Sequence, residues 1–180
     1  MDNSKQMDDL RFDLLRNAIY HTARRQFLDR CMRITNFFVI ILGASAATDL
    51  MSRHVGAKWL AAAAAIVATL QLVADFAVSA RDHGYLQRRC YELLSELESL
   101  EPNEEQKIAS IRAKLTILYG EEPPQMRALD AIAYNAACDS IGKSNARVKI
   151  DFLHSLLRHI CPFNGTEFEY VQPKQTARIS

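Results

Sequence analysis

Residues 59–81 constrain this chain more than any other stretch, and they read WLAAAAAIVATLQLVADFAVSAR. The run carries no formal charge from Trp59 to Ala74, then has one acid at Asp75, and it ends at Arg81. The hydrocarbon of a bilayer, about 30 Å thick, takes roughly 20 mainly apolar residues, whereas runs of about 10 to 14 residues are more often buried core. The run is therefore either a membrane-spanning helix or the core helix of a soluble bundle.

A second uncharged run, residues 34–48, precedes it along the chain. Both flanks of the apolar region are dense in charge, whereas between Ile34 and Ala80 the only formal charges lie at Asp49, Arg53, Lys58 and Asp75. The connection from Asp49 to Lys58 is expected to turn the chain back. This segregation predicts a transmembrane hairpin of two spans over residues 34–80, and a soluble bundle of long helices is the alternative.

Apolar residues three and four apart, without sustained alternation, predict an all-α fold. The expected helices cover about residues 7–50, 58–100, 103–120, 125–141 and 147–160, and Asn103 is predicted to cap the third, with Gln106 at the capping-box position. The leucine-rich stripe that follows the hairpin is expected in the core, with self-association as the alternative. The stripes are Leu10, Leu14 and Ala18; Leu86, Cys90, Leu93, Leu97 and Leu100; Ile108, Ile111, Leu115 and Leu118; and Val148, Phe152, Leu156 and Ile160.

The domain organisation that follows has four segments. Residues 1–33 form an amphipathic cytosolic helix, residues 34–80 the hairpin, residues 81–161 a cytosolic helical region, and residues 162–180 an irregular tail. The net charge of +1 gives no overall field that would recruit nucleic acid, so no nucleic-acid partner is expected. The cysteines lack paired spacing and are predicted to be free thiols on the cytosolic side: Cys31, Cys90, Cys138 and Cys161.

Basic residues gather beside the hairpin and predict its orientation. Cytoplasmic flanks of membrane spans are rich in Lys and Arg, and the connecting loop here has only Arg53 and Lys58. Both termini are therefore expected in the cytoplasm, with Trp59 at the opposite interface. Binding of anionic lipid headgroups or of a nucleotide partner is the alternative role of the membrane-interface arginines, which are Arg24, Arg25, Arg30, Arg33 and Arg81.

Four polar residues of the hairpin are the candidate functional positions. Asp75 lies near one edge of the second span, where an acid lines a pathway, responds to protonation, or locks the hairpin through a hydrogen bond to Thr35 or Asn36. Gln71 lies one helical turn before Asp75, so the two residues form a polar stripe that faces either a lumen or a neighbouring subunit.

No catalytic constellation is found in the sequence. It has no glycine-rich phosphate loop, and His154 and His159 are five residues apart, unlike a helical zinc pair. Cys161 near His159 is a weak metal signal, and Arg81-Asp82-His83 lacks a nucleophile beside it. We therefore expect a protein that is not an enzyme and holds neither cofactor nor metal.

The layout resembles the SLATT family of small bacterial two-span proteins associated with nucleotide-signalling conflict systems. The resemblance covers about residues 8–163. It rests on the arginine-rich RNAIYHTARRQFLDR, on ALDAIAYNAACDSIG and on LLRHICPF. In the second of these, Tyr134-Asn135 matches the family's motif and is a candidate interaction surface. A half-buried Tyr beside an Asn that bonds nearby backbone is an equally ordinary bundle feature.

The resemblance implies an effector that assembles in the bacterial inner membrane and perturbs it by forming pores in anti-phage defence. Its expected partners are the lipid bilayer, further copies of the chain, and a separate nucleotide-sensing or nucleotide-synthesising protein, because no sensor domain is visible in this sequence. Two other functions stay open at this point. One is a soluble helical scaffold with a buried apolar hairpin, and the other is a membrane anchor or adaptor without a pore.

Overall fold

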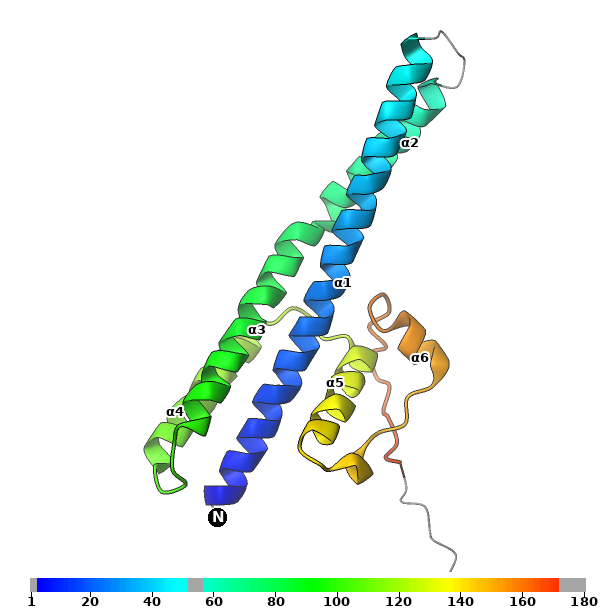
Figure 1. The fold of residues 1–180 in the computed structure, drawn as a ribbon. Coiled ribbons are helices and arrows are strands. Elements are labelled where there is room, and N and C mark those ends of the chain that lie inside the picture. The colour runs from blue at the N-terminus through cyan, green and yellow to red at the C-terminus, as the bar shows by residue number, and fades with distance from the viewer. Residues whose placement is uncertain (1–2, 52–56, 172–180) are drawn as a thin grey trace, which may run out of the picture. The chain divides into compact units, whose positions relative to one another are not determined.

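The computed structural model of the protein describes residues 3–51 and 57–171 (Figure 1). Within these residues the fold is all-α, as predicted, and extended pairing is confined to one bridge between Val148 and Tyr170. The predicted loop residues Arg53, His54 and Gly56 lie outside the described residues, as do the last residues of the predicted tail. The helices are α1 (Asn3–Met51), α2 (Ala57–Ala74), α3 (Phe76–Glu98), α4 (Glu105–Glu121), α5 (Arg127–Ser140) and α6 (Phe152–Leu157), with a 3₁₀ turn at Ser144–Ala146.

The chain divides into two compact units. The first contains the described residues up to Thr22 and from Tyr85 onwards, and the second is Ala23–Gly84. The predicted segments end at residues 33 and 80, where the composition changes. The first boundary between the units lies about ten residues before residue 33, and the second lies four residues after residue 80. Helices α1 and α3 each contribute residues to both units.

The core of the first unit is built from the predicted stripes of three helices. Leucine, isoleucine and smaller apolar residues at spacings of three and four bury one face of each helix, which is the pattern of helix packing. The leucine-rich stripe of α3 belongs to this intramolecular core, with Leu100 packed against its edge. The core residues are Met7, Leu10, Leu14 and Ala18 of α1; Leu86, Cys90, Leu93 and Leu97 of α3; and Ile108, Ile111, Leu115 and Leu118 of α4.

The start of α4 differs from the prediction. Its N-cap residue is Glu104 and not Asn103, and the cap position makes no side-chain hydrogen bond to the helix. Instead, the Glu104 carboxylate accepts a 2.9 Å hydrogen bond from the backbone N–H of Glu101, which closes the turn between α3 and α4. The end of α5 agrees with the prediction, because Gly142 has a φ of 73°, a left-handed value that stops a helix.

The last predicted helix, residues 147–160, is mostly wrong. Only Phe152–Leu157 is helical, and Asp151 caps it by accepting a hydrogen bond from the backbone N–H of His154. Val148 is not helical, because its backbone pairs with Tyr170 and bonds to the side chain of Asn135. Three residues of the apolar stripe of this segment, Phe152, Leu156 and Ile160, are consequently exposed and not packed in a core, and Val148 is half-buried.

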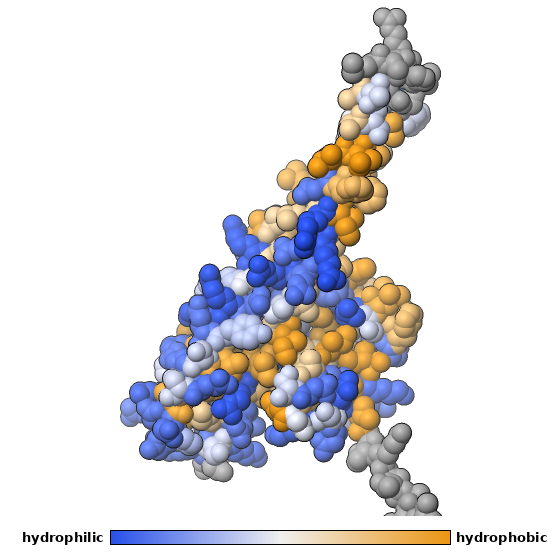
Figure 2. Space-filling view, viewed as in Figure 1, coloured by the Kyte–Doolittle hydropathy of each residue, from blue (hydrophilic) through white to orange (hydrophobic). Residues whose placement is uncertain are grey.

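The second unit is an antiparallel pair of apolar helical stretches. Arg25 lies beside Gly84, and Asn36 beside Gln71, so the chain runs out along α1 and returns along α2 and the start of α3. These two stretches are long and apolar enough to cross a membrane. In each of them, no residue of the apolar 18-residue segment that meets this criterion is buried. Figure 2 shows apolar side chains at the surface of this unit. The large ones that are exposed include Ile34, Phe37, Phe38, Ile40, Ile41, Trp59, Ile66, Leu70, Leu72 and Val73.

Candidate functional site

The side chain of Gln71 links the two apolar stretches. Its Nε2 donates a hydrogen bond of 2.8 Å to Oδ1 of Asn36. The structure thus brings together two of the four polar residues that the sequence indicates in the hairpin. Amide side chains that bond across apolar helices satisfy groups that would otherwise be unpaired in hydrocarbon, and they fix the register of the two helices.

Thr35 does not take part in this link. Its hydroxyl lies 2.9 Å from the carbonyl oxygen of Cys31 and 3.0 Å from that of Met32, so it donates back to its own helix. A threonine in this arrangement satisfies its hydroxyl without any partner on another helix. Within the described residues no hydrogen bond joins Thr35 or Asn36 to Asp75.

Asp75 interrupts the helix that the sequence predicts to be continuous from residue 58 to residue 100. Its φ is 42°, a left-handed value that is unusual for a residue other than glycine, and it separates α2 from α3. The backbone N–H of Asp75 still bonds to the Gln71 carbonyl, and its carbonyl accepts from Ser79, both at 3.1 Å. These two bonds lie on either side of the interruption between α2 and α3.

The membrane-interface arginines all lie in the second unit. Arg25 is 3.7 Å from the Asp29 carboxylate, and Arg33 donates to the Asp29 carbonyl at 3.2 Å. Pairs this exposed contribute little to stability. The others are similarly placed at the surface: Arg24 lies over the ring of Phe27, Arg30 is exposed, and Arg81 is 3.8 Å from Asp82.

Tyr134 and Asn135 have different roles in the first unit. Asn135 is nearly buried and holds the backbone of Val148 with two hydrogen bonds, donating 2.8 Å to its carbonyl and accepting 2.7 Å from its amide. Tyr134 packs edge-on against Phe12, with ring centroids 5.3 Å apart. Burial and the neighbouring Cys138 and Tyr170 raise the pKa of Tyr134 to about 12, so its phenol is neutral at physiological pH. Asn135 is thus a structural clamp, and only Tyr134 faces a pocket.

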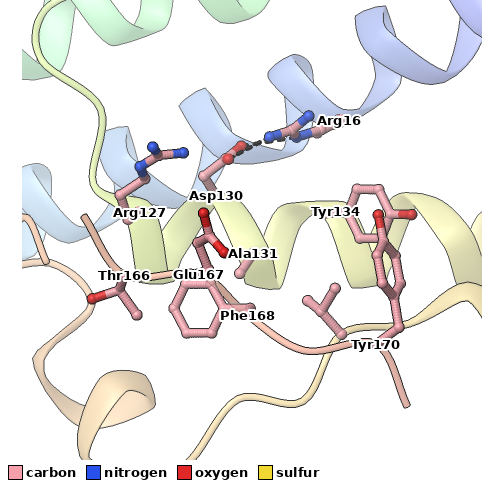
Figure 3. Close-up of a pocket in the computed structure, with 10 residues that line it drawn as sticks. Arg16, Arg127, Asp130, Ala131, Tyr134, Thr166, Glu167, Phe168 and Tyr170 are labelled. Carbon is pink, nitrogen blue, oxygen red and sulfur yellow. Dashed lines mark hydrogen bonds and ion pairs between the residues drawn. The ribbon is translucent and has the colours of Figure 1, made fainter. Parts of the chain in front are cut away.

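That pocket has a volume of about 440 Å³ and lies between α5 and the C-terminal segment (Figure 3). On one side, Arg16 and Asp130 form an ion pair: Nε of Arg16 donates 2.8 Å to Oδ1 of Asp130, and a second guanidinium nitrogen contacts Oδ2. Burial lowers the pKa of Arg16, but the hydrogen bond and charge of Asp130 outweigh burial and raise it. The other lining residues are Arg127, Ala131, Tyr134, Val148, Thr166, Glu167, Phe168 and Tyr170.

The sequence reading missed this ion pair. Its signal is present, because Asp130 is the one acid among the buried residues at the start of α5, between Leu129 and Ala131. A buried carboxylate requires a partner, and Arg16 lies on the face of α1 next to the buried Asn17. The pair neutralises two of the four charged residues that line the pocket, and the other two are Arg127 and Glu167.

The four cysteines are free thiols, as predicted, with Cys90 and Cys138 buried. Among residues 3–51 and 57–171, no three His, Cys, Asp or Glu side chains are grouped so that they could hold a metal ion. No family model, characterised protein or solved structure matches this chain. The resemblance to the SLATT family therefore stays a prediction from the sequence.

Proposed function

We propose that this protein spans a bilayer with its apolar hairpin and that several copies assemble to perturb the membrane, as a non-enzymatic effector. The observation that carries the proposal is the exposure of the hairpin, because no residue of the apolar 18-residue segment in either stretch is buried. A hairpin that serves as the core of a soluble scaffold is expected to be mostly covered by protein. Exposed apolar surface of this extent is instead expected where lipid is the solvent.

The lengths of the two stretches support a bilayer as their solvent. Helix α2 has 18 residues, and at 1.5 Å per residue it extends about 27 Å, close to the hydrocarbon thickness of about 30 Å. With Trp59 at the outer interface, Gln71 lies roughly 18 Å deeper and Asp75 roughly 24 Å deeper. The Asn36–Gln71 hydrogen bond is then inside the hydrocarbon, and Asp75 is near its cytoplasmic edge.

A pore would supply the surroundings that the interruption at Asp75 needs, as would the cytoplasmic interface. Backbone groups without hydrogen-bond partners are costly in hydrocarbon, so an irregular backbone is tolerated only in contact with water, with the interface or with other protein. The exposed Asp75 carboxylate has the same requirement. A two-helix hairpin cannot enclose a channel by itself, so several copies are required, with their Asp75 residues beside a shared water-filled path.

The biological setting rests on the resemblance and on the distribution of charge. Basic residues beside the spans favour cytoplasmic termini, and the SLATT resemblance favours the bacterial inner membrane and a role in anti-phage defence. In that setting a separate protein senses infection or synthesises a nucleotide signal. The assembled hairpins then depolarise the membrane of the infected cell.

Two measurements test the proposal in order. Extraction of membranes at alkaline pH separates integral proteins from the rest, and we expect the full-length protein to stay in the pellet. Recovery in the soluble fraction, monodisperse without detergent, would favour the soluble scaffold. Induced expression in bacteria with a membrane-potential dye then separates a pore from an anchor, because an anchor or adaptor inserts without changing the potential.

A further inference from the structure

Arginine is concentrated in the second unit at the end of the hairpin away from its connecting loop. Residues 23–33 and 76–84, all of them described by the structure, contain five arginines and two aspartates, a net charge of +3, whereas the whole chain has +1. Arg33 directly precedes the uncharged run that begins at Ile34, and Arg81 directly follows Ala80. These residues belong to the same compact unit as the hairpin, so the structure places them relative to its apolar surface.

The three arginines nearest to the apolar stretches, Arg30, Arg33 and Arg81, are all exposed, and we name them the arginine cluster. Nε of Arg33 donates 3.2 Å to the backbone carbonyl of Asp29. Nε of Arg81 lies 3.8 Å from the carboxylate of Asp82, which is longer than a hydrogen bond. Within residues 3–51 and 57–171, no arginine of the cluster donates a hydrogen bond to a carboxylate.

Basic side chains of the first unit are satisfied differently. Three of them donate hydrogen bonds from their charged nitrogens to carboxylates, which supply the acceptors that the arginine cluster lacks. A guanidinium group has five N–H donors, so most donors of the cluster stay open to an acceptor from outside the chain. The three pairs of the first unit are Arg89 with Glu92, Lys107 with Glu104, and Lys114 with Glu96.

The two segments that carry the cluster lie side by side. A Cβ atom at Gly84 would be only 3.3 Å from Cδ of Arg25, so α1 and α3 are in contact at this point. Because the two helices run in opposite directions, Arg33 lies about two turns from this contact toward the apolar stretches, and Arg81 lies about one turn from it in the same direction. Both segments therefore present arginine at the same end of the hairpin.

The position of the cluster selects an anionic phospholipid as its ligand. In a bilayer spanned by the hairpin, residues that border the spans lie in the headgroup layer, which is roughly 5 to 8 Å thick on each side of the hydrocarbon. Guanidinium groups bind phosphate through paired N–H donors, and basic clusters beside a span are typical of sites for anionic lipids. A soluble nucleotide offers the same phosphate chemistry, but the cluster borders an exposed apolar surface, as a headgroup does.

We infer that the arginine cluster binds the phosphate groups of anionic phospholipids in preference to zwitterionic ones. The inference rests on the proposed function, in which the hairpin spans the bilayer and this end lies at its cytoplasmic face. The cluster then determines which lipids surround the assembled hairpins.

Lipid selectivity of the full-length protein tests the inference. The protein is reconstituted in phosphatidylcholine vesicles that contain a trace of spin-labelled phosphatidylglycerol or spin-labelled phosphatidylcholine, each labelled in its acyl chain. Lipid in contact with membrane spans is restricted in its motion, and electron paramagnetic resonance measures the restricted fraction of each lipid. The cluster variant replaces all three arginines by glutamine. The matched control removes the same charge from paired side chains of the first unit, through Arg89→Gln, Lys107→Gln and Lys114→Gln.

We expect the wild type and the control to restrict more phosphatidylglycerol than phosphatidylcholine, and high salt to reduce the difference. The cluster variant should lose most of this preference, by at most about fivefold for each arginine replaced, and restrict phosphatidylcholine as the wild type does. Equal fractions of the two lipids for the wild type would overturn the inference, and so would an unchanged preference in the cluster variant. Either result leaves the proposed function intact, because the spans still restrict lipid.

Inorganic phosphate and ATP distinguish the two sources of phosphate. Each is added to the wild type in vesicles, with sodium chloride at the same ionic strength as the reference. We expect neither to release more phosphatidylglycerol than chloride does. Greater release by either compound would assign the cluster to a soluble ligand and overturn the inference. A wild type that restricts no lipid at all would refute the proposed function together with the inference.

Discussion

Gln71 and Asn36 are 35 residues apart in the chain, and their side-chain amides meet at 2.8 Å between the two apolar stretches. The link is polar, yet Phe37 follows Asn36 in the chain, and Leu70 and Leu72 flank Gln71. In hydrocarbon, each amide would be costly without the other. The pair therefore fixes the register of the hairpin and leaves Asp75, one turn further along, without a side-chain hydrogen bond among the described residues.

We predict that Asn36 and Gln71 are energetically coupled. In a double-mutant cycle with Asn36→Leu and Gln71→Leu, the coupling free energy of unfolding should be about 0.6 kcal/mol and at most about 1.7 kcal/mol, the mean and the maximum for hydrogen bonds between membrane helices. Unfolding of the purified protein from mild detergent into dodecyl sulfate is the measurement. Thr35→Val is the matched control, because its hydroxyl bonds its own helix and should show no coupling to Gln71. Strictly additive effects of the two leucine substitutions would contradict the hydrogen bond.

The ion pair of Arg16 and Asp130 gives a second prediction. Asp130 is buried whereas the side chain of Arg16 is 32% exposed, so Asp130→Ala should lower the free energy of unfolding by about 2 to 3 kcal/mol, less than the loss of a fully buried partner. Asp139→Ala is the control, since the pair of Asp139 with Arg147, at 3.7 Å, is exposed on both sides and should contribute about 0 to 1 kcal/mol. Thermal unfolding in detergent compares the two. Equal losses would show that the Asp130 pair is solvated.

A third prediction concerns the alkaline stability of the first unit. Burial, and then the charge of Glu122, raise the pKa of Cys90 from 9.0 to about 12. Between those values the unfolded chain releases the thiol proton while the folded chain keeps it. The folded state then binds more protons, so the stability falls as the pH rises from about 9 to about 12 and is unaffected by this group below pH 9.

Replacing the thiol should remove that part of the pH dependence. We expect the free energy of unfolding of Cys90→Ala to fall less steeply than that of the wild type above pH 9, although the variant is less stable at neutral pH because of the lost volume. Chemical unfolding at a series of pH values gives the two slopes. At pH 8, a thiol reagent should label the half-exposed Cys161 quickly and Cys90 only on unfolding. Parallel pH curves for wild type and variant would refute the assignment.

Periodicity alone was enough to predict the all-α class and the core of the first unit. The predicted stripes that begin at Leu10, Leu86 and Ile108 lie in the core. Each of these helices buries one face, and the spacing of three and four residues that marks such a face is encoded in the local sequence. The stripe at Phe152 has the same spacing but is exposed, since the chain around Val148 pairs with Asn135 and Tyr170 instead of extending the helix. Such long-range pairing has no local signal.

The hairpin shows the same division between local and distant information. Its composition predicts two apolar helices, and the helices are present. The sequence predicted Asp75 as a partner of Thr35 or Asn36, whereas Gln71, one turn earlier, bonds to Asn36. The partner depends on the register between two helices, which the apolar pattern leaves free over several residues. The left-handed φ of Asp75 was not predicted, because an aspartate inside an apolar run is also compatible with an unbroken helix.

The last prediction separates the backbone of Asp75 from its charge. Asp75→Gly keeps the left-handed φ without strain, and Asp75→Asn tolerates this φ while removing the charge. Asp75→Ala disfavours the left-handed φ by about 1 to 2 kcal/mol and therefore favours an unbroken helix. If the interruption opens a water-filled path, the Ala variant should lose membrane depolarisation while the Gly variant keeps it. If the carboxylate lines that path, the Asn variant should depolarise but lose preference for cations over anions, measured as a shift in reversal potential. Equal amounts of each protein in the membrane fraction are the control, and an Ala variant as active as the wild type would exclude Asp75 from the path.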